Sequence, residues 1–140
     1  MPLKKYSILL FLCTISICLK AQESNTLWDA RLKMFVYEFS EKLPSFPGGE
    51  EALLKYMTKI RYPKEQTHLQ SKLNLSFVID TTGNLLDKCI LDKNESAYTP
   101  LDKEGISMLD RMPKWIPGEL NGKKVAVRYY LPMIICLKMD

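Results

Sequence analysis

The sequence has little of the side-chain chemistry on which enzymes and metal sites depend. Its 140 residues include one histidine, His68, which lies in a polar stretch without a cluster of cysteine, histidine or carboxylate residues around it. An isolated titratable side chain rarely forms a catalytic or metal site by itself. Gly48 and Gly49 precede a predicted helix, but no Walker or dinucleotide-binding pattern surrounds them, so they indicate a tight structural loop. We therefore expect a chain that is not an enzyme and binds no cofactor or metal.

The sequence also lacks internal repeats, low-complexity linkers and an apolar run of the roughly 20 residues that a membrane-spanning helix requires. A shorter apolar run at residues 6–19 follows two lysines and precedes Ala21, a pattern typical of a secretory signal peptide cleaved after residue 21. Lipoprotein processing at Cys18 is a weaker alternative, because Ile17 is bulky for the position before the cysteine. We expect three segments: a signal peptide (1–21), an N-terminal arm with a candidate short strand (22–43) and one domain (44–140).

A strong charge of either sign is missing once this leader is set apart. The leader contains Lys4, Lys5 and Lys20, so 17 of the 20 basic residues remain, against 16 acidic residues. A nearly neutral chain has no electrostatic footprint for nucleic acid or for an acidic membrane surface. The composition therefore predicts neither partner.

The domain itself reads as α+β, in the order helix, strand, strand, helix, strand. The first helix is predicted to open at Glu50 and to end at Pro63, and the second to open at the cap Thr99 and to end at Pro113. Gly105 lies on the inner face of the second helix, which predicts close packing against the sheet. The buried stripe of the first helix is expected to contain Leu53, Leu54, Met57 and Ile60.

Alternation of apolar and polar residues predicts the strands. Residues 73–79 should form a strand with one buried face, residues 85–91 its hairpin partner with a bulge near Asp87, and residues 125–137 the last strand. In the arm, residues 34–40 fit a short strand. The apolar residues of the arm would equally share one helix face, so both alternatives stay open: Trp28, Leu32, Phe35, Val36 and Phe39.

These elements predict a three-stranded antiparallel sheet in the order 2-1-3, with both helices on one face. A helical crossover strongly prefers to join parallel strands, so the last strand should run beside the first and antiparallel to it. Pro132 supports an edge position for the last strand, because proline cannot donate to a ladder. Cys89 and Cys136 then lie about two strand spacings, or 9.5 Å, apart, so both thiols are predicted to stay free.

Five pieces of sequence occur in a fixed order along the domain and cover about two thirds of the chain. They are PSFPGGEEALLKY (44–56), YP (62–63), LSFVIDTTGNLLD (75–87), PLDKEGISMLDRMPKWIPG (100–118) and KKVAVRYYLPM (123–133). Together they make residues 44–137 similar to the TonB C-terminal domain family, in particular to its bacterial branch that begins with a proline–phenylalanine–proline–glycine–glycine loop.

The resemblance implies a periplasmic module that recognises an extended peptide of an outer-membrane receptor or another envelope protein, in TonB-dependent transmembrane transport. The peptide would add a strand to the exposed edge of the last β-strand, which is β-augmentation. From the residues alone, Trp115 and Tyr129 are expected in the core and Tyr130 at the surface. The partner-binding residues that the resemblance implies are Tyr62, Pro63, Val127, Arg128, Tyr129, Tyr130, Leu131, Pro132 and Met133.

Two departures from the family pattern leave alternative functions open. Residues 22–43 contain no proline-rich spacer, and the nominal outer face of the last strand carries Tyr130, Ile134 and Cys136, where relatives are mostly polar. Exposed apolar residues in a row indicate cover by the N-terminal arm, by a second copy or by a partner. The alternatives are a membrane-anchored energy transducer that keeps its leader, and a self-associating structural module of the cell envelope, such as a homodimer.

Overall fold

The computed structural model describes residues 26–65 and 69–135, so the predictions for the leader, for His68 and for Cys136 lie outside the described residues. The elements in chain order are β1 (Thr26–Asp29), β2 (Met34–Tyr37), α2 (Gly49–Met57), β3 (Lys72–Ile79), β4 (Leu85–Ile90), the 3₁₀ helix η1 (Glu95–Ala97), α3 (Pro100–Asp110), β5 (Gly118–Leu120) and β6 (Lys123–Ile134).

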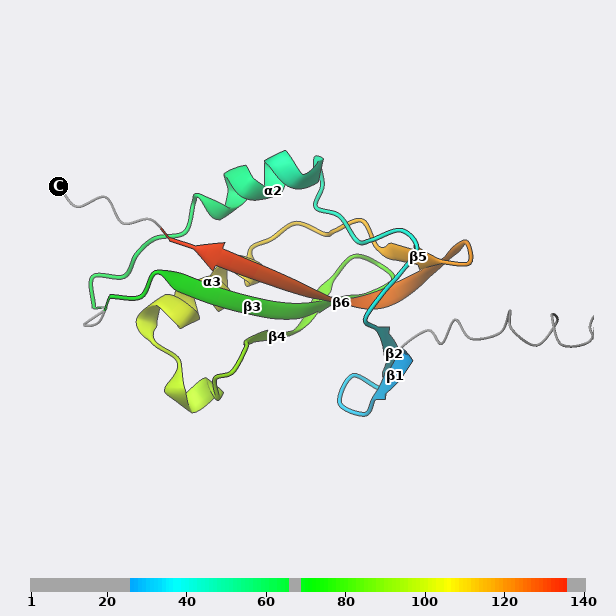
Figure 1. Ribbon diagram of the computed structural model, residues 1–140, viewed down its shortest axis with the longest axis horizontal. Helices are drawn as coiled ribbons and strands as arrows, with labels where there is room; N and C mark the ends of the chain where they lie inside the picture. Colours follow the sequence, from blue (N-terminus) through cyan, green and yellow to red (C-terminus); the bar gives the residue numbers. More distant parts are fainter. Residues whose placement is uncertain (1–25, 66–68, 136–140) are drawn as a thin grey trace, which may run out of the picture.

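The six strands form a mixed, curled sheet in the order β1-β2-β6-β3-β4, with β5 paired to the start of β6 (Figure 1). All described pairs are antiparallel except β2 with β6. The predicted order of the three main strands is confirmed, because β3 lies between β4 and β6. The prediction of a three-stranded antiparallel sheet with one candidate strand in the arm is incomplete. The candidate strand is present as β2, but β1 and β5 were not predicted, because strands of four residues or fewer are too short for alternation to reveal them.

Both helices cover one face of this sheet, as predicted, and the main core lies between. Trp115 is 3% exposed and packs its ring against those of Phe46, Phe77 and Tyr129, so its predicted core position is confirmed. A Cβ on Gly105 would lie 2.5 Å from Cδ2 of Leu73, which confirms the predicted close packing of α3 on β3. The fully buried core residues include Leu73, Leu75, Phe77, Ile79, Leu101, Met108 and Leu109.

The second helix begins where the sequence predicts, but both helices end early. The Thr99 hydroxyl accepts the backbone N–H of Asp102, and the Asp102 carboxylate accepts that of Thr99, so a reciprocal capping box opens α3. However, α2 ends at Met57 and α3 at Asp110, before the prolines expected to stop them. A proline sets the limit beyond which a helix cannot run, not the place where it ends. Ile60 therefore lies outside the helical stripe.

A hairpin made by β1 and β2 covers the opposite face of the sheet at one end. Val36 of β2 packs there against Val78 and Ala126, and Val78 is 0% exposed. The strand alternative for the arm is therefore confirmed and the helix alternative is wrong. The expectation that β3 has one buried face is also wrong, because this cover comes from a segment far away in sequence.

The predicted bulge in β4 is present. The pairing register of β3 with β4 shifts by one residue between Ser76 and Val78, and Asp87 has a φ of 48°, in the left-handed region. Cys89 on the same strand is a free thiol, as predicted, and burial is the main cause that raises its pKa.

Candidate functional site

The last strand, β6, is paired up to its end on one side, but on the other side its pairing stops well before the end. Its pairing with β3 runs from Val127 to Ile134. On the opposite side, β2 pairs only with Ala126 and Val127, and beyond them no described strand covers β6. The prediction that the last strand lies at the sheet edge is thus wrong for the first part of β6, because β2 pairs with it there. We call the side of residues 128–134 that faces away from β3 the open edge.

Backbone parity decides which residues of β6 present their polar groups at the open edge. Ile135 donates its N–H to the carbonyl of Ser71 at 2.8 Å, in register with the β3–β6 ladder. Hydrogen-bonded pairs recur at every second residue of an antiparallel ladder, so Leu131 and Met133 also bond to β3. The alternate residues point their backbone groups outward: Tyr130, Pro132 and Ile134. Because proline has no N–H, these three residues offer fewer donors than acceptors.

Pro132 occupies one of these outward positions and removes a donor from the open edge. Its nitrogen faces away from β3, which is where a sheet tolerates proline, and natural edge strands use proline against unwanted pairing. Replacing Pro132 with alanine should restore the donor, and we expect measurable self-association in sedimentation velocity at concentrations where the parent protein is monomeric. Pro113, which is exposed beyond α3, provides the matched control, Pro113→Ala. Equal sedimentation of all three proteins would contradict the protective role of Pro132.

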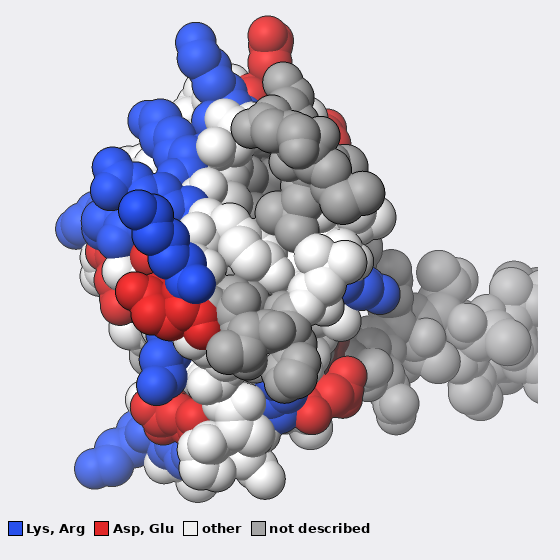
Figure 2. Space-filling model, turned by 90° about the vertical axis from the view of Figure 1, so that its left-hand side faces the viewer, with Lys and Arg blue, Asp and Glu red and all other residues white. Residues whose placement is uncertain are grey.

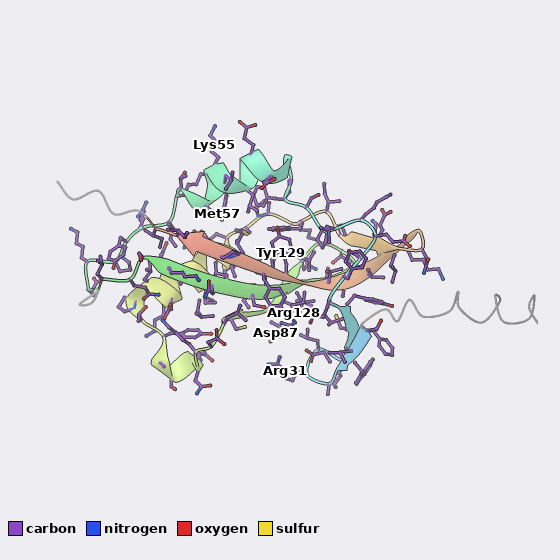
Figure 3. All side chains as sticks on the ribbon, in the orientation of Figure 1. Arg31, Lys55, Met57, Asp87, Arg128 and Tyr129 are labelled. Carbon is purple, nitrogen blue, oxygen red and sulfur yellow. The ribbon has the colours of Figure 1, made fainter. Side chains whose placement is uncertain are left out.

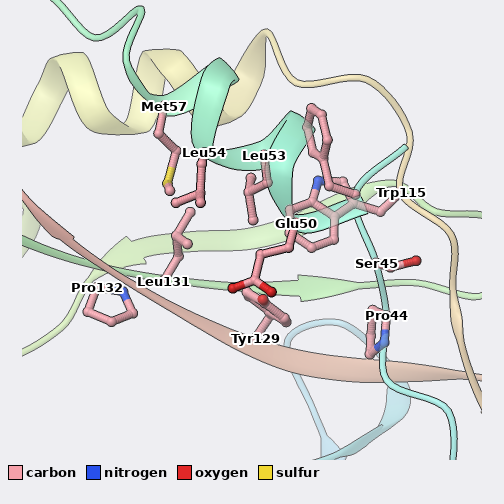
Figure 4. A pocket seen from close by; sticks show the side chains of 11 residues that line it. Pro44, Ser45, Glu50, Leu53, Leu54, Met57, Trp115, Tyr129, Leu131 and Pro132 are labelled. Carbon is pink, nitrogen blue, oxygen red and sulfur yellow. The ribbon is translucent and has the colours of Figure 1, made fainter. Parts of the chain in front are cut away.

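The helix α2 lies beside the open edge and forms an apolar groove with it. The narrower part of this groove has a volume of about 400 Å³. Figure 4 shows that Glu50 of α2 extends toward Tyr129 of β6 in this part. A strand added to the open edge would place alternate side chains in this groove. The wider part, of about 930 Å³, is lined by Leu54, Met57, Thr58, Ile60, Pro132, Met133, Ile134 and Ile135.

Two neighbouring tyrosines of β6 face opposite sides of the sheet. Tyr129 packs on the core, as predicted, with its ring 5.0 Å from that of Trp115; burial and then the charge of Glu50 raise its pKa. Tyr130 is 48% exposed, and its hydroxyl donates to the Glu38 carboxylate at 3.1 Å. Burial, followed by this hydrogen bond, raises the Tyr130 pKa. Of the two tyrosines, Tyr130 borders the open edge.

Arg128 is engaged within the protein. Its guanidinium lies 3.0 Å from the Asp87 carboxylate and 3.6 Å from that of Asp29, and Arg31 contacts the same Asp87 oxygen at 2.9 Å. Figure 3 shows Arg31, Asp87 and Arg128 on the side of the sheet away from α2. These ion pairs join the β1–β2 hairpin to β4 and β6. Arg128 therefore fastens the hairpin, a role that the sequence did not reveal.

The end of α2 and the segment after it are basic. Residues 55–64 contain four cations and no acidic residue, all four cations are exposed, and none forms an ion pair with any described residue: Lys55, Lys59, Arg61 and Lys64. Figure 2 looks onto the end of the molecule where β6 finishes and shows Lys and Arg gathered on one flank, with Asp and Glu among them, beside uncharged surface. The cations that border the wide part of the groove are those of residues 55–64.

The tyrosine–proline element lies at this same end. The hydroxyl of Tyr62 accepts the backbone N–H of Gln70 at 3.0 Å, just before β3 starts. The first residue of β3, Lys72, pairs with Ile134, so Tyr62 is held near the tip of β6. Sequence reasoning missed Leu54, which it assigned to the core. Leu54 is in fact 54% exposed, and Leu53 is the residue of the nine-residue helix α2 that is fully buried.

Within the described parts of the chain, no group of three or more His, Cys, Asp and Glu side chains is arranged to hold a metal ion. In the same residues, neither helix has the length and apolar character needed to cross a bilayer.

Comparison with known proteins gives one match. Residues 58–134, more than half of the chain, match the family described as Gram-negative bacterial TonB protein C-terminal. The matched range runs from the end of α2 to the end of β6 and leaves out the β1–β2 hairpin. Neither the curated proteins nor the solved structures yield a match.

Proposed function

Because this chain belongs to the TonB C-terminal domain family, we propose that it binds an extended segment of an outer-membrane receptor or another envelope protein as an added strand on the open edge of β6. Domains of this family are non-catalytic modules involved in TonB-dependent energy transduction to outer-membrane receptors. Such receptors are reached from the periplasmic face of the cell envelope, which is where we propose that the chain acts.

The open edge is the observation that carries this proposal. Past Val127, the described residues provide β6 with a partner only on the β3 side, so a row of backbone groups is available to a guest strand. An unpaired strand edge is a ready template for another polypeptide. Main-chain hydrogen bonds then supply affinity, and the pockets for alternate side chains supply specificity.

The surroundings of the edge define the guest that fits it. Alternate guest side chains enter the groove between α2 and β6, where Leu54 and Met57 favour aliphatic residues. The unpaired cations of residues 55–64 favour an acidic residue at the neighbouring end of the guest. The preferred partner segment is therefore extended, apolar at every second position and acidic at one end.

An NMR titration tests this function by comparing the β6 amides that face the open edge with the β6 amides that bond to β3. The probe is a synthetic peptide that begins with two glutamates and continues with alternating valine and threonine. We expect the amide signals of Tyr130 and Ile134 to shift and their hydrogen exchange to slow, because their N–H groups face the guest. The amides of Leu131 and Met133 should keep their slow exchange throughout, since they already bond to β3.

The matched control is the same peptide with N-methylated backbone at alternate residues, which removes the guest's donors but keeps its side chains. It should bind weakly or not at all. Unchanged amides of Tyr130 and Ile134 at millimolar parent peptide, or equal binding of the methylated peptide, would rule out strand addition at this edge.

A further inference from the structure

The β1–β2 hairpin exposes aromatic and aliphatic side chains that the proposed strand addition does not use. Trp28 is 56% exposed and Phe35 57% exposed, and their rings meet edge-to-face at 5.0 Å. Leu27, which is 66% exposed, pairs with Val36 and so lies on the other face of the hairpin. The hairpin lies outside the matched family range and at the opposite end of the molecule from the tip of β6 (Figure 1). Clustered exposed apolar side chains mark an interaction surface.

Cations accompany these apolar side chains. Phe35 and Lys124 line the same surface hollow, and Lys123 precedes Lys124 at the start of β6. Lys33 lies in the turn of the hairpin. All three lysines are exposed, and none makes an ion pair within the described residues. Asp80 also lines the hollow, and its carboxylate, which accepts hydrogen bonds from Thr82 and Asn84, offsets part of this positive charge.

Aromatic residues next to lysines are typical of protein surfaces that rest on a lipid bilayer. The amphipathic ring of tryptophan favours the headgroup level, and lysines are attracted by anionic lipids.

We propose that the β1–β2 hairpin seats this domain on an anionic membrane surface. Trp28 and Phe35 enter the headgroup region, while Lys33, Lys123 and Lys124 contact the anionic headgroups. A second copy of the chain fits this surface less well, because a symmetric pair would bring the same three lysines together. The overall charge, which is nearly neutral without the leader, hides this arrangement, since a sum over residues carries no information on where the charges lie.

When the hairpin is bound to the membrane in this way, the open edge of β6 points away from the bilayer. Binding of the membrane and binding of a partner peptide are then separate events at opposite ends of the molecule. The vesicle experiment below therefore stands or falls independently of strand addition.

Tryptophan fluorescence tests the seat, because Trp115 is buried at 3% exposure and Trp28 is not. The protein is purified from the envelope as the cell processes it and mixed with vesicles of phosphatidylethanolamine and phosphatidylglycerol. We expect a blue shift of the Trp28 emission and its quenching by brominated lipid, both absent in Trp28→Phe. Neutral phosphatidylcholine vesicles should give weaker binding, and added salt should weaken binding to the anionic ones.

Two sets of surface variants test whether the lysines near the hairpin, rather than lysines in general, bind the protein to the vesicles. Replacing Lys33, Lys123 and Lys124 with glutamine should reduce vesicle affinity at least ten-fold, since each lysine near an anionic surface contributes roughly five-fold before screening. The matched control makes the same charge change elsewhere, at the exposed Lys72, Lys103 and Lys114, and should bind like the parent.

Two results would overturn the seat. One is a Trp28 emission that vesicles leave unchanged, even if the protein sediments with them. The other is a blue shift that needs no vesicles and grows with protein concentration, which would identify a second copy as the occupant.

Discussion

Replacing Asp102 with alanine should lower the free energy of unfolding by about 2–3 kcal/mol, because it removes a helix cap and a buried hydrogen-bond acceptor. Asp102 is 0% exposed at the start of α3. Its carboxylate accepts hydrogen bonds from Lys93 Nζ at 2.7 Å, from the Thr99 backbone at 2.9 Å and from Gln70 Nε2 at 2.9 Å. Alanine removes this acceptor from the buried start of α3, and the helix also loses its capping box.

The same carboxylate should make stability depend on pH. Burial alone would raise the Asp102 pKa, but the hydrogen bonds from Lys93, Thr99 and Gln70 outweigh burial and hold the pKa below its ordinary 3.8. Because the folded pKa is lower than the unfolded one, the carboxylate stabilises the fold above pH 3.8. That contribution is lost as the pH falls through the folded pKa. The difference in stability between the parent and Asp102→Asn should therefore be largest near neutral pH and shrink in acid.

Urea unfolding of both proteins at several pH values measures this difference. The control is Asp110→Asn, which removes an ion pair to Lys88 of 2.6 Å whose carboxylate is 57% exposed. Exposed pairs contribute less than about 1 kcal/mol, so this variant should unfold almost like the parent. A constant difference between parent and Asp102→Asn down to pH 3 would show that the Asp102 charge does not contribute.

The long elements of the fold could be predicted because each leaves a local signal. The strand β3 alternates over eight residues, and Thr99 followed by Pro100 identifies the start of α3 from sequence alone. The hairpin could not be predicted in the same way. The parallel pairing of β2 with β6 depends on Val36 meeting Ala126, and nothing near either residue in the sequence indicates the other.

The candidate site was predictable only in part, for the same reason. Pro132 indicated an edge, and its outward parity agrees with that reading. The beginning of the open edge is set by where β2 leaves β6, which is a long-range contact. The groove residue Leu54 was missed because its sequence pattern also fits a core helix, whereas the pattern of the last strand does place Ile134 on the outer face, where it is 79% exposed.

Replacing Tyr130 with proline should reduce peptide affinity about ten-fold relative to Tyr130→Ala while leaving the fold intact. Both variants remove the ring and its hydrogen bond to Glu38. Only proline removes the outward N–H and leaves a guest carbonyl unpaired, which costs about 1–3 kcal/mol. The fold should accept this change, since Pro132 already occupies an outward position two residues along the same strand.

Leu131→Pro completes the comparison, because the Leu131 N–H bonds to β3 opposite Leu75. Its loss breaks the central ladder and should destabilise the protein by about 3 kcal/mol or more. Binding is measured by titration of the glutamate–valine–threonine peptide, and folding by urea unfolding of each variant. Proline at position 130 should thus weaken binding of the guest peptide, whereas proline at the next position, 131, should destabilise the fold of the protein itself. If Tyr130→Pro bound the peptide as well as Tyr130→Ala, the guest would have to lie elsewhere than on the backbone of β6.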